Sequence, residues 1–142
     1  MEQIAAEPRE RYVNNCKDST MGEVKTFRDL DAWQVGMDTV ELTYTLTSLF
    51  PDSERFGLTS QMRRAAVSIP SNIAEGQAVR TPRWNLRHIV TALGSLAELE
   101  VARRLHYVAD DGALDLQQTI NRLRQLLYGM RRDKERQMRL PT

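Results

Sequence analysis

The sequence predicts an all-α protein, an up-down-up-down four-helix bundle with helix two kinked at Pro70 and a flexible N-terminal extension. Three observations support this fold class. Four segments repeat apolar residues at alternating steps of three and four, which keeps them on one face of a helix. The connections between these segments are short and carry proline, glycine or aspartate. Only seven glycines and five prolines occur in 142 residues, too few for the many turns of an all-β fold.

Residues 1–26 lack a sustained apolar period and form the predicted extension. Met21 could itself be the first residue of the protein. Residues 1–20 are therefore either a true tail or the product of an upstream start codon. The segment has no apolar run of the kind that a signal peptide needs, and the chain has no stretch of ~20 apolar residues that would span a membrane. The single cysteine, Cys16, cannot form an internal disulfide. These features predict a cytoplasmic protein without membrane contact.

The bundle is expected over residues 27–133, with its first helix over residues 29–50. The main apolar stripe of this helix contains Leu30, Trp33, Met37, Val40, Tyr44 and Thr47, and a second set contains Leu42, Leu46 and Leu49. Asp29 is suited to cap the start of the helix, and Pro51 disfavours helical geometry at Phe50. Apolar surface beyond one stripe calls for a neighbouring subunit and therefore predicts a homo-oligomer.

The second helix is expected from residue 53 or 54 to about Gly76. Its apolar stripe consists of Leu58, Met62, Ala65, Ile69 and Ile73. Pro70 interrupts the helix, because proline lacks an N–H group and its ring crowds the carbonyl one turn earlier. A kink is favoured over a break that restarts the helix at Asn72, because the apolar period continues across the proline. Gly76 tolerates a positive φ and is expected just past the helix end.

Thr81-Pro82 signals the start of the third helix, because threonine can cap a helix and proline suits its first position. This helix is expected to reach about residue 108. Its predicted inward face contains Leu86, Val90, Leu93, Ala97, Val101, Leu105 and Val108. Asp111-Gly112 is expected to form the next turn. The fourth helix then carries Leu116, Ile120, Leu123, Leu127 and Met130, and residues 134–142 are expected to be a basic tail.

The net charge of +1 conceals an uneven distribution. Residues 1–120 hold 13 Lys or Arg against 17 Asp or Glu, whereas residues 121–142 hold 7 against 2. Three groups of cations are candidates for contacts with RNA or DNA, because arginine and lysine neutralise phosphates. They are Arg63 and Arg64; Arg80, Arg83 and Arg87; and Arg122, Arg124, Arg131, Arg132 and Lys134. Trp84 can stack on a base or cap the core. Such a charge block is usually a solvated helix face or a frayed tail. This interpretation and a contact with nucleic acid both stay open.

Four polar residues are expected to form a structural network between the second and third helices. Asn72 and Glu75 follow the proline, and Ser95 and Glu98 lie one turn apart beside small residues of the third helix. Small residues let two helices approach closely, and a carboxylate in such a contact must be hydrogen-bonded. A ligand site built from the same residues is the alternative.

No residue pattern points to an enzyme, a cofactor or a metal site. The inward Glu-x-x-His pairs of di-metal bundles are missing, because His88 and His106 follow Asn85 and Arg103 at that spacing. Each histidine is expected at the surface or as a cap. Cys16 has no base nearby in sequence to activate it, and no glycine-rich phosphate loop occurs. We therefore expect a non-enzymatic protein with neither cofactor nor metal.

A family resemblance is carried by three blocks in order, FRDLDAW at 27–33, FPDSERFGLTSQMRRAAVSIPSNIAEG at 50–76 and LGSLAELEVA at 93–102. Over about residues 27–130 the chain resembles the ribosomal RNA intervening-sequence proteins, a four-helix-bundle family similar to the accessory variability determinant of diversity-generating retroelements. The resemblance implies a cytoplasmic ring of five subunits without catalytic residues. In the retroelement branch it also implies a basic surface that binds nucleic acid and a reverse transcriptase. The nearly neutral charge departs from that branch, which leaves a passive protein-interaction scaffold as the alternative function.

Overall fold

The computed structural model describes residues 26–79, 81–105 and 110–140. These residues form four long α-helices and two short 3-10 helices, with no strand among them, which confirms the all-α prediction. The long helices are α2 (Asp31–Thr47), α3 (Leu58–Ala78), α4 (Pro82–Arg103) and α5 (Asp110–Arg139). The short helices are η2 (Phe27–Asp29) and η3 (Asp52–Glu54). The predicted extension, apart from residue 26, lies outside the described residues, as do Arg80 and His106.

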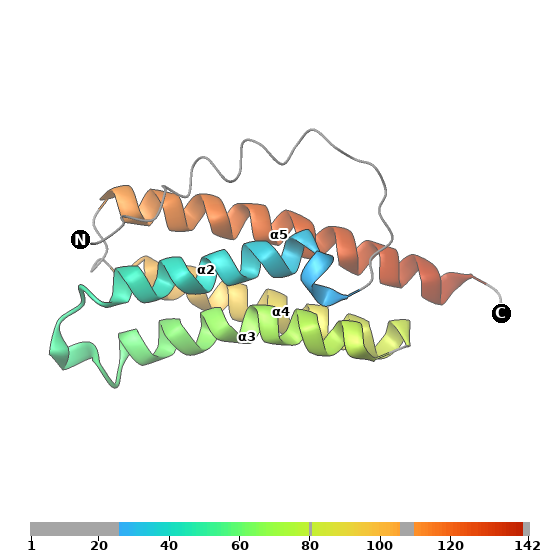
Figure 1. The fold of residues 1–142 in the computed structure, drawn as a ribbon, viewed down its shortest axis with the longest axis horizontal. Coiled ribbons are helices and arrows are strands. Elements are labelled where there is room, and N and C mark those ends of the chain that lie inside the picture. Colours follow the sequence, from blue (N-terminus) through green and yellow to red (C-terminus); the bar gives the residue numbers. More distant parts are fainter. Residues whose placement is uncertain (1–25, 80, 106–109, 141–142) are drawn as a thin grey trace.

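Each long helix packs against two others. α2 and α4 each contact α3 and α5, whereas the described residues form no contact between α2 and α4 or between α3 and α5. In Figure 1 the chain reverses direction from each long helix to the next. The helices therefore occupy the corners of a square, and the start of α2, the end of α3 and the start of α4 meet at one end of the bundle.

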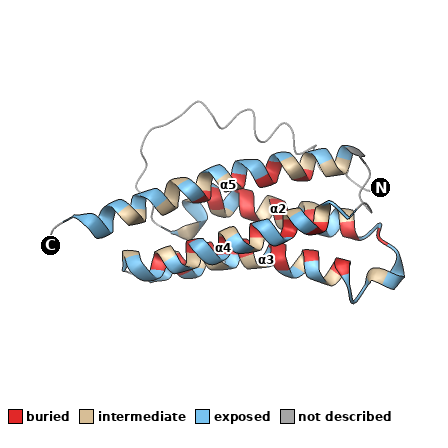
Figure 2. Cartoon of the chain, turned by 180° about the vertical axis from the view of Figure 1, so that it is seen from behind, coloured by how far each residue is buried: buried red, intermediate tan, exposed pale blue. Residues whose placement is uncertain are grey.

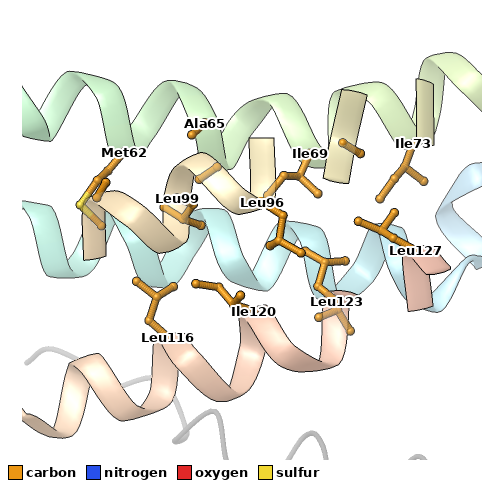
Figure 3. Close-up of a cluster of buried hydrophobic side chains, with 14 of the residues drawn as sticks. Met62, Ala65, Ile69, Ile73, Leu96, Leu99, Leu116, Ile120, Leu123 and Leu127 are labelled. Atoms are coloured by element: carbon orange, nitrogen blue, oxygen red, sulfur yellow. The ribbon is translucent and has the colours of Figure 1, made fainter. Parts of the chain in front are cut away.

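The core lies between the four helices and is drawn in Figure 3. α5 contributes its whole predicted stripe, since Leu116, Ile120, Leu123 and Leu127 are fully buried and Met130 packs against the core. The predicted stripe of α3 is buried as well, over residues 58–73. Periodicity therefore identified the inward faces of these two helices correctly.

The inward face predicted for α4 is wrong. The helix buries Asn85, Ile89, Ala92, Leu96, Leu99 and Ala102 instead. Val108 lies outside the described residues; of the other predicted residues, Leu86 and Leu93 are partly buried, and the rest are exposed. These exposed residues are Val90, Ala97, Val101 and Leu105. Figure 2 shows exposed positions along α4 beside its buried face. α4 therefore carries a second apolar row on its outward side.

The stripe predicted for the first helix lies mostly at the edge of the core: Leu30, Trp33 and Val40 are partly buried and pack against it, whereas Tyr44 is exposed. α2 buries Ala32, Val35, Gly36, Thr39, Thr43 and Thr47, and only the last of these belongs to the predicted stripe. The hydroxyls of Thr39, Thr43 and Thr47 donate to the carbonyl oxygens four residues earlier, at 2.8, 2.7 and 2.7 Å. These bonds satisfy the buried hydroxyls, so a face of small residues can pack closely against its neighbours without an unpaired polar group.

Pro70 lies inside α3, which continues across it, so the alternative of a break at Asn72 is wrong. The bend expected at the proline stays a prediction. The proline ring faces Gly36 of α2, where an added Cβ would lie 3.3 Å from the Cβ of Pro70. A glycine on one helix therefore accommodates the proline of the other.

Gly76 does not end the second helix, because α3 continues to Ala78. It is buried against α4, and a Cβ at this position would lie only 2.9 Å from the Cβ of His88. The absence of a side chain at Gly76 allows α3 and α4 to approach closely. Its role is thus close packing rather than a positive φ.

Several helix ends also differ from the predictions. α3 begins at Leu58, whose backbone N–H donates to the Glu54 carboxylate at 3.0 Å, while residues 52–54 form η3. Asp29 accepts the backbone N–H of Thr26 at 2.9 Å and so caps η2 rather than α2. α4 starts at Pro82 as predicted, but residues 111–112 belong to α5 and do not form a turn. α5 continues to Arg139, so most of the predicted tail is helical.

Candidate functional site

The predicted cations are divided between the two ends of the bundle. Arg63 and Arg64 lie near the start of α3, whereas Arg83 and Arg87 lie in the first two turns of α4. These helices run in opposite directions, so their starts are at opposite ends (Figure 1). The structure therefore does not bring the first predicted group together with the second.

Arg63 is engaged by its own chain. Its Nε donates to the hydroxyl of Thr47 at 2.8 Å, and its guanidinium carbon lies 4.5 Å from the ring centroid of Tyr44. Both partners belong to α2, so Arg63 joins α2 to α3 through a hydrogen bond and a cation–π contact. Arg64, the next residue, is exposed.

The start of α4 presents an exposed aromatic ring among cations. Trp84 is 53% exposed, and the guanidinium carbon of Arg87 lies 4.8 Å from its ring centroid. Arg83 is exposed beside them. Trp84 does not cap the core, because more than half of it is exposed to solvent.

The C-terminal part of α5 reaches the same end of the bundle and runs past the ends of α3 and α4 (Figure 1). Residues 131–139 contain five cations and two carboxylates. We call the cations of α4 and α5 that gather here the basic end. They are Arg83, Arg87, Arg131, Arg132, Lys134, Arg136 and Arg139.

Part of this positive charge is offset within α5. Arg131 donates through Nε to Glu135 at 2.9 Å, and Arg136 pairs with Asp133 at 2.6 Å. The hydrogen bond and the negative charge of Glu135 raise the pKa of Arg131 above its ordinary value, so Arg131 stays a cation. Arg132 forms no ion pair with any described residue. It is therefore among the cations best able to meet a phosphate.

The remaining predicted cations of α5 lie nearer the middle of the helix. Arg124 forms an ion pair with Glu100 of α4 and donates to Asn121 at 3.1 Å. It therefore ties α5 to α4. Arg122 is exposed.

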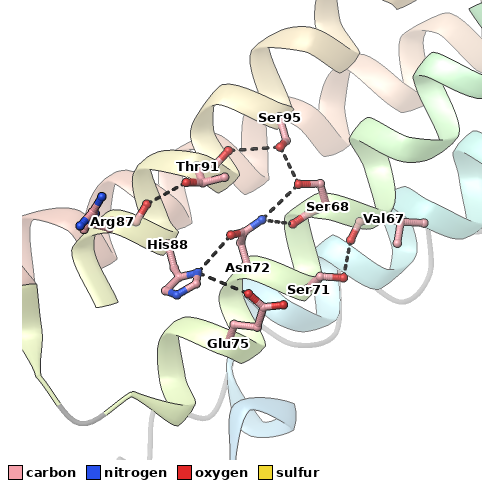
Figure 4. A network of polar contacts seen from close by, with 9 residues as sticks. All are labelled: Val67, Ser68, Ser71, Asn72, Glu75, Arg87, His88, Thr91 and Ser95. Atoms are coloured by element: carbon pink, nitrogen blue, oxygen red, sulfur yellow. Dashed lines mark hydrogen bonds and ion pairs between the residues drawn. The ribbon is translucent and has the colours of Figure 1, made fainter. Parts of the chain in front are cut away.

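The predicted polar network joins α3 to α4, with a different membership (Figure 4). The hydroxyls of Ser68 and Ser95 lie 2.8 Å apart. Asn72 donates through Nδ2 to the carbonyl and hydroxyl oxygens of Ser68, at 2.8 and 3.1 Å. The Oδ1 of Asn72 lies 3.1 Å from Nδ1 of His88, which is 3.6 Å from the Glu75 carboxylate. Asn72 and Ser95 are thus connected through Ser68.

Glu98 does not belong to this network. It is exposed and accepts a separate hydrogen bond from Nε2 of Gln61 on α3, at 3.4 Å. Glu75 lies at the edge of the network, with 67% of its side chain exposed. His88 was expected at the surface or as a cap, yet its side chain is only 26% exposed and contacts Asn72 and Glu75 of the network. His88 lies opposite Asn72 because α3 packs against α4. No local sequence motif predicts this packing.

Other kinds of site receive no support from the described residues. An open depression between the start of α3 and the end of α4 is lined by polar and apolar side chains, including Phe56, Arg64, Glu98 and Leu105. The described residues contain no cluster of three or more side chains suited to hold a metal ion. None of their helices has the length and apolar character needed to cross a bilayer.

A comparison with curated proteins found no match. Residues 28–129 match the protein family described as 23S rRNA-intervening sequence protein. The match runs from η2 into α5 and includes the network and the start of α4. Arg131, Arg132 and Lys134 lie just beyond it. The matched region is most of the chain, which therefore belongs to the family of 23S rRNA-intervening sequence proteins.

Proposed function

We propose that this protein is a non-enzymatic, cytoplasmic, homo-oligomeric accessory factor that binds nucleic acid weakly through its basic end. The observation that carries the proposal is the meeting of cations from two helices at one end of the bundle, beside an exposed tryptophan. Arginines contact phosphates without reading sequence, so the expected binding is sequence-independent and falls steeply with salt.

The outward row of α4 supports the homo-oligomer. This row contains Val90, Gly94, Ala97 and Val101, and the exposed Leu105 follows just beyond the end of the helix. Val101 is 63% exposed, and a Cβ added at Gly94 would meet nothing within 4 Å. An exposed apolar row with small residues at its centre suits close contact with a second copy. A ring, most simply the pentamer implied by the family resemblance, would repeat the basic end around its axis and strengthen weak binding through avidity.

The nucleic-acid part of the proposal is tested by the salt dependence of binding to a single-stranded oligonucleotide. Replacing Arg83 and Arg132 with alanine should weaken binding and reduce the slope of log affinity against log salt by about 1.4, since each phosphate contact contributes about 0.7. Arg64→Ala is the matched control, because Arg64 is equally exposed but lies at the opposite end. Failure of the wild-type protein to bind at ~50 mM salt would reject this proposal.

The oligomer is tested by light scattering. Val101→Asp should reduce the molar mass to that of a smaller assembly while helicity is retained, because a charge on the outward row opposes its burial. Leu114→Asp is the control, since Leu114 is also exposed but lies on α5. A monomeric wild-type protein at micromolar concentration would contradict the homo-oligomer.

A passive scaffold for protein partners, including the reverse transcriptase implied by the resemblance, is the second candidate function. The observation that favours it is the engagement of Arg63, Arg124, Arg131 and Arg136 by side chains of the same chain. Arginines distributed among such partners are typical of a structural surface. Lack of nucleic-acid binding together with an intact oligomer would favour the scaffold.

A further inference from the structure

We infer that Trp84 is a stacking platform for an unpaired base, so that the ligand of the basic end is single-stranded nucleic acid. This inference rests on the proposed function and specifies its ligand class. It begins with the contrast between the two tryptophans. Trp33 is partly buried, packs against the core and meets the Phe27 ring edge-on at a centroid distance of 5.3 Å. Trp84, in contrast, is 53% exposed and carries an arginine over its ring.

The position of Trp84 is fixed by a rigid element. It lies in the first turn of α4, after Pro82 and directly before Asn85, which is buried. Arg87, one turn later, places its guanidinium 4.8 Å from the indole centroid. This contact covers one side of the ring and limits the rotation of the tryptophan side chain. The side chain therefore loses less conformational entropy when a base stacks on it.

The surroundings of the ring complement one nucleotide. A base stacked on the open part of the indole would carry its phosphates toward the exposed cations beside it, Arg83 and Arg87. Arginine suits this position because its planar guanidinium can stack on a ring and still donate from its edges to phosphate oxygens. No other aromatic ring of the described residues pairs with this indole.

Stacking on an indole discriminates between unpaired and paired bases. In a duplex each base is covered on both faces by its neighbours, so only a terminal pair can stack on a protein ring, whereas an unpaired strand can splay its bases. The cations of the basic end meet phosphates of both forms. Trp84 therefore supplies a preference for single strands over duplexes that the charge alone does not give.

The test uses the full-length Trp33→Phe protein, in which Trp84 is the only tryptophan. Fluorescence titrations with a single-stranded oligothymidine of about 12 nucleotides, and with the duplex that it forms with the complementary oligodeoxyadenosine, are run beside anisotropy of the labelled oligonucleotides. The single strand should quench Trp84 and bind more tightly than the duplex. Trp84→Ala should weaken binding of the single strand about 5- to 150-fold and leave duplex binding nearly unchanged, since stacking of one base is worth that factor. Trp84→Phe should retain part of the preference.

Three results would count against the inference. Binding of the single strand without quenching, or with equal affinity after Trp84→Ala, would overturn the stacking platform but keep the proposed function. A Trp84 emission that changes with protein concentration and not with oligonucleotide would assign the ring to a subunit contact. Failure to bind either oligonucleotide would overturn the proposed function and the inference together. Circular dichroism of each variant checks that its helices are intact.

Discussion

Replacing Gly76 with alanine tests how closely α3 and α4 approach. An alanine Cβ at this position would lie 2.9 Å from the Cβ of His88 and 3.4 Å from the Oδ1 of Asn85. The Cβ of His88 is attached directly to the backbone of α4, and Asn85 is 5% exposed, so neither can move aside without shifting the helix. Overpacking of this kind costs about 1 to 3 kcal/mol, and the better helix propensity of alanine offsets up to about 1 kcal/mol. We expect a net loss of about 1 to 2 kcal/mol in the free energy of unfolding.

The same substitution at Gly129 provides the control for Gly76→Ala. The nearest neighbour of a Cβ added at Gly129 is Nη2 of Arg132, at 3.9 Å, which is ordinary van der Waals contact. Gly129→Ala should therefore stabilise the protein by about 0.5 to 1 kcal/mol through backbone entropy and propensity alone. Urea unfolding at a single protein concentration measures both variants. Equal or greater stability of Gly76→Ala relative to Gly129→Ala would refute the close contact between α3 and α4.

Three further substitutions test the contacts between helices by the same unfolding assay. Asn72→Ala should lower the free energy of unfolding by about 1 to 2 kcal/mol, because it removes the hydrogen bonds to Ser68 and the contact with His88 that joins α3 to α4. Glu98→Ala should change it by less than about 0.5 kcal/mol, because the carboxylate is exposed; a loss near 2 kcal/mol would restore Glu98 to the network. Arg63→Ala should cost about 1 to 2 kcal/mol, since it removes both the hydrogen bond to Thr47 and the cation–π contact with Tyr44; an unchanged stability would show that these contacts contribute nothing.

The number and type of the helices followed from the sequence, but two of their faces did not. α5 has one apolar stripe and a polar remainder, so its period could be read only one way. α4 has two apolar rows, one through Leu96 and Leu99 and one through Val90 and Val101. Periodicity weighs both rows alike, because it contains no information on which neighbour each row meets. Only the tertiary packing distinguishes them.

The inward face of α2 was predicted incorrectly for a different reason. Its large apolar residues suggested the inward face, yet they pack only at the edge of the core, and the buried face consists of threonine, alanine, glycine and one valine. Close approach of helices selects for small side chains, and threonine satisfies its own hydroxyl by bonding to the preceding turn. Hydrophobicity scales rank such a face as polar. A similar limit applies to Gly76, where the need for glycine comes from His88 on another helix and not from local backbone conformation.

The sequence predicted which types of residue form the candidate site, but only partly which of them lie together. Local sequence showed that cations surround Trp84 and follow Met130, but their meeting at one end depends on the alternating helix directions and the length of α5. Arg63 illustrates the converse. Nothing within its own helix indicates that Tyr44 and Thr47 of α2 engage it.

The contact between Gly36 of α2 and Pro70 of α3 has a consequence for the loop between these helices. The contact of Gly36 with Pro70 sets the axial register of the two helices from within their length, so residues 48–57 do not have to set it by being short or stiff. Lengthening a loop whose ends are held elsewhere is cheap, at about 0.6 kcal/mol for each doubling. Phe56, 89% exposed, marks a place in this loop that contributes little to the core. A peptide tag or a small domain could be inserted beside it, at the opposite end of the bundle from the basic end, while the helices keep their alignment.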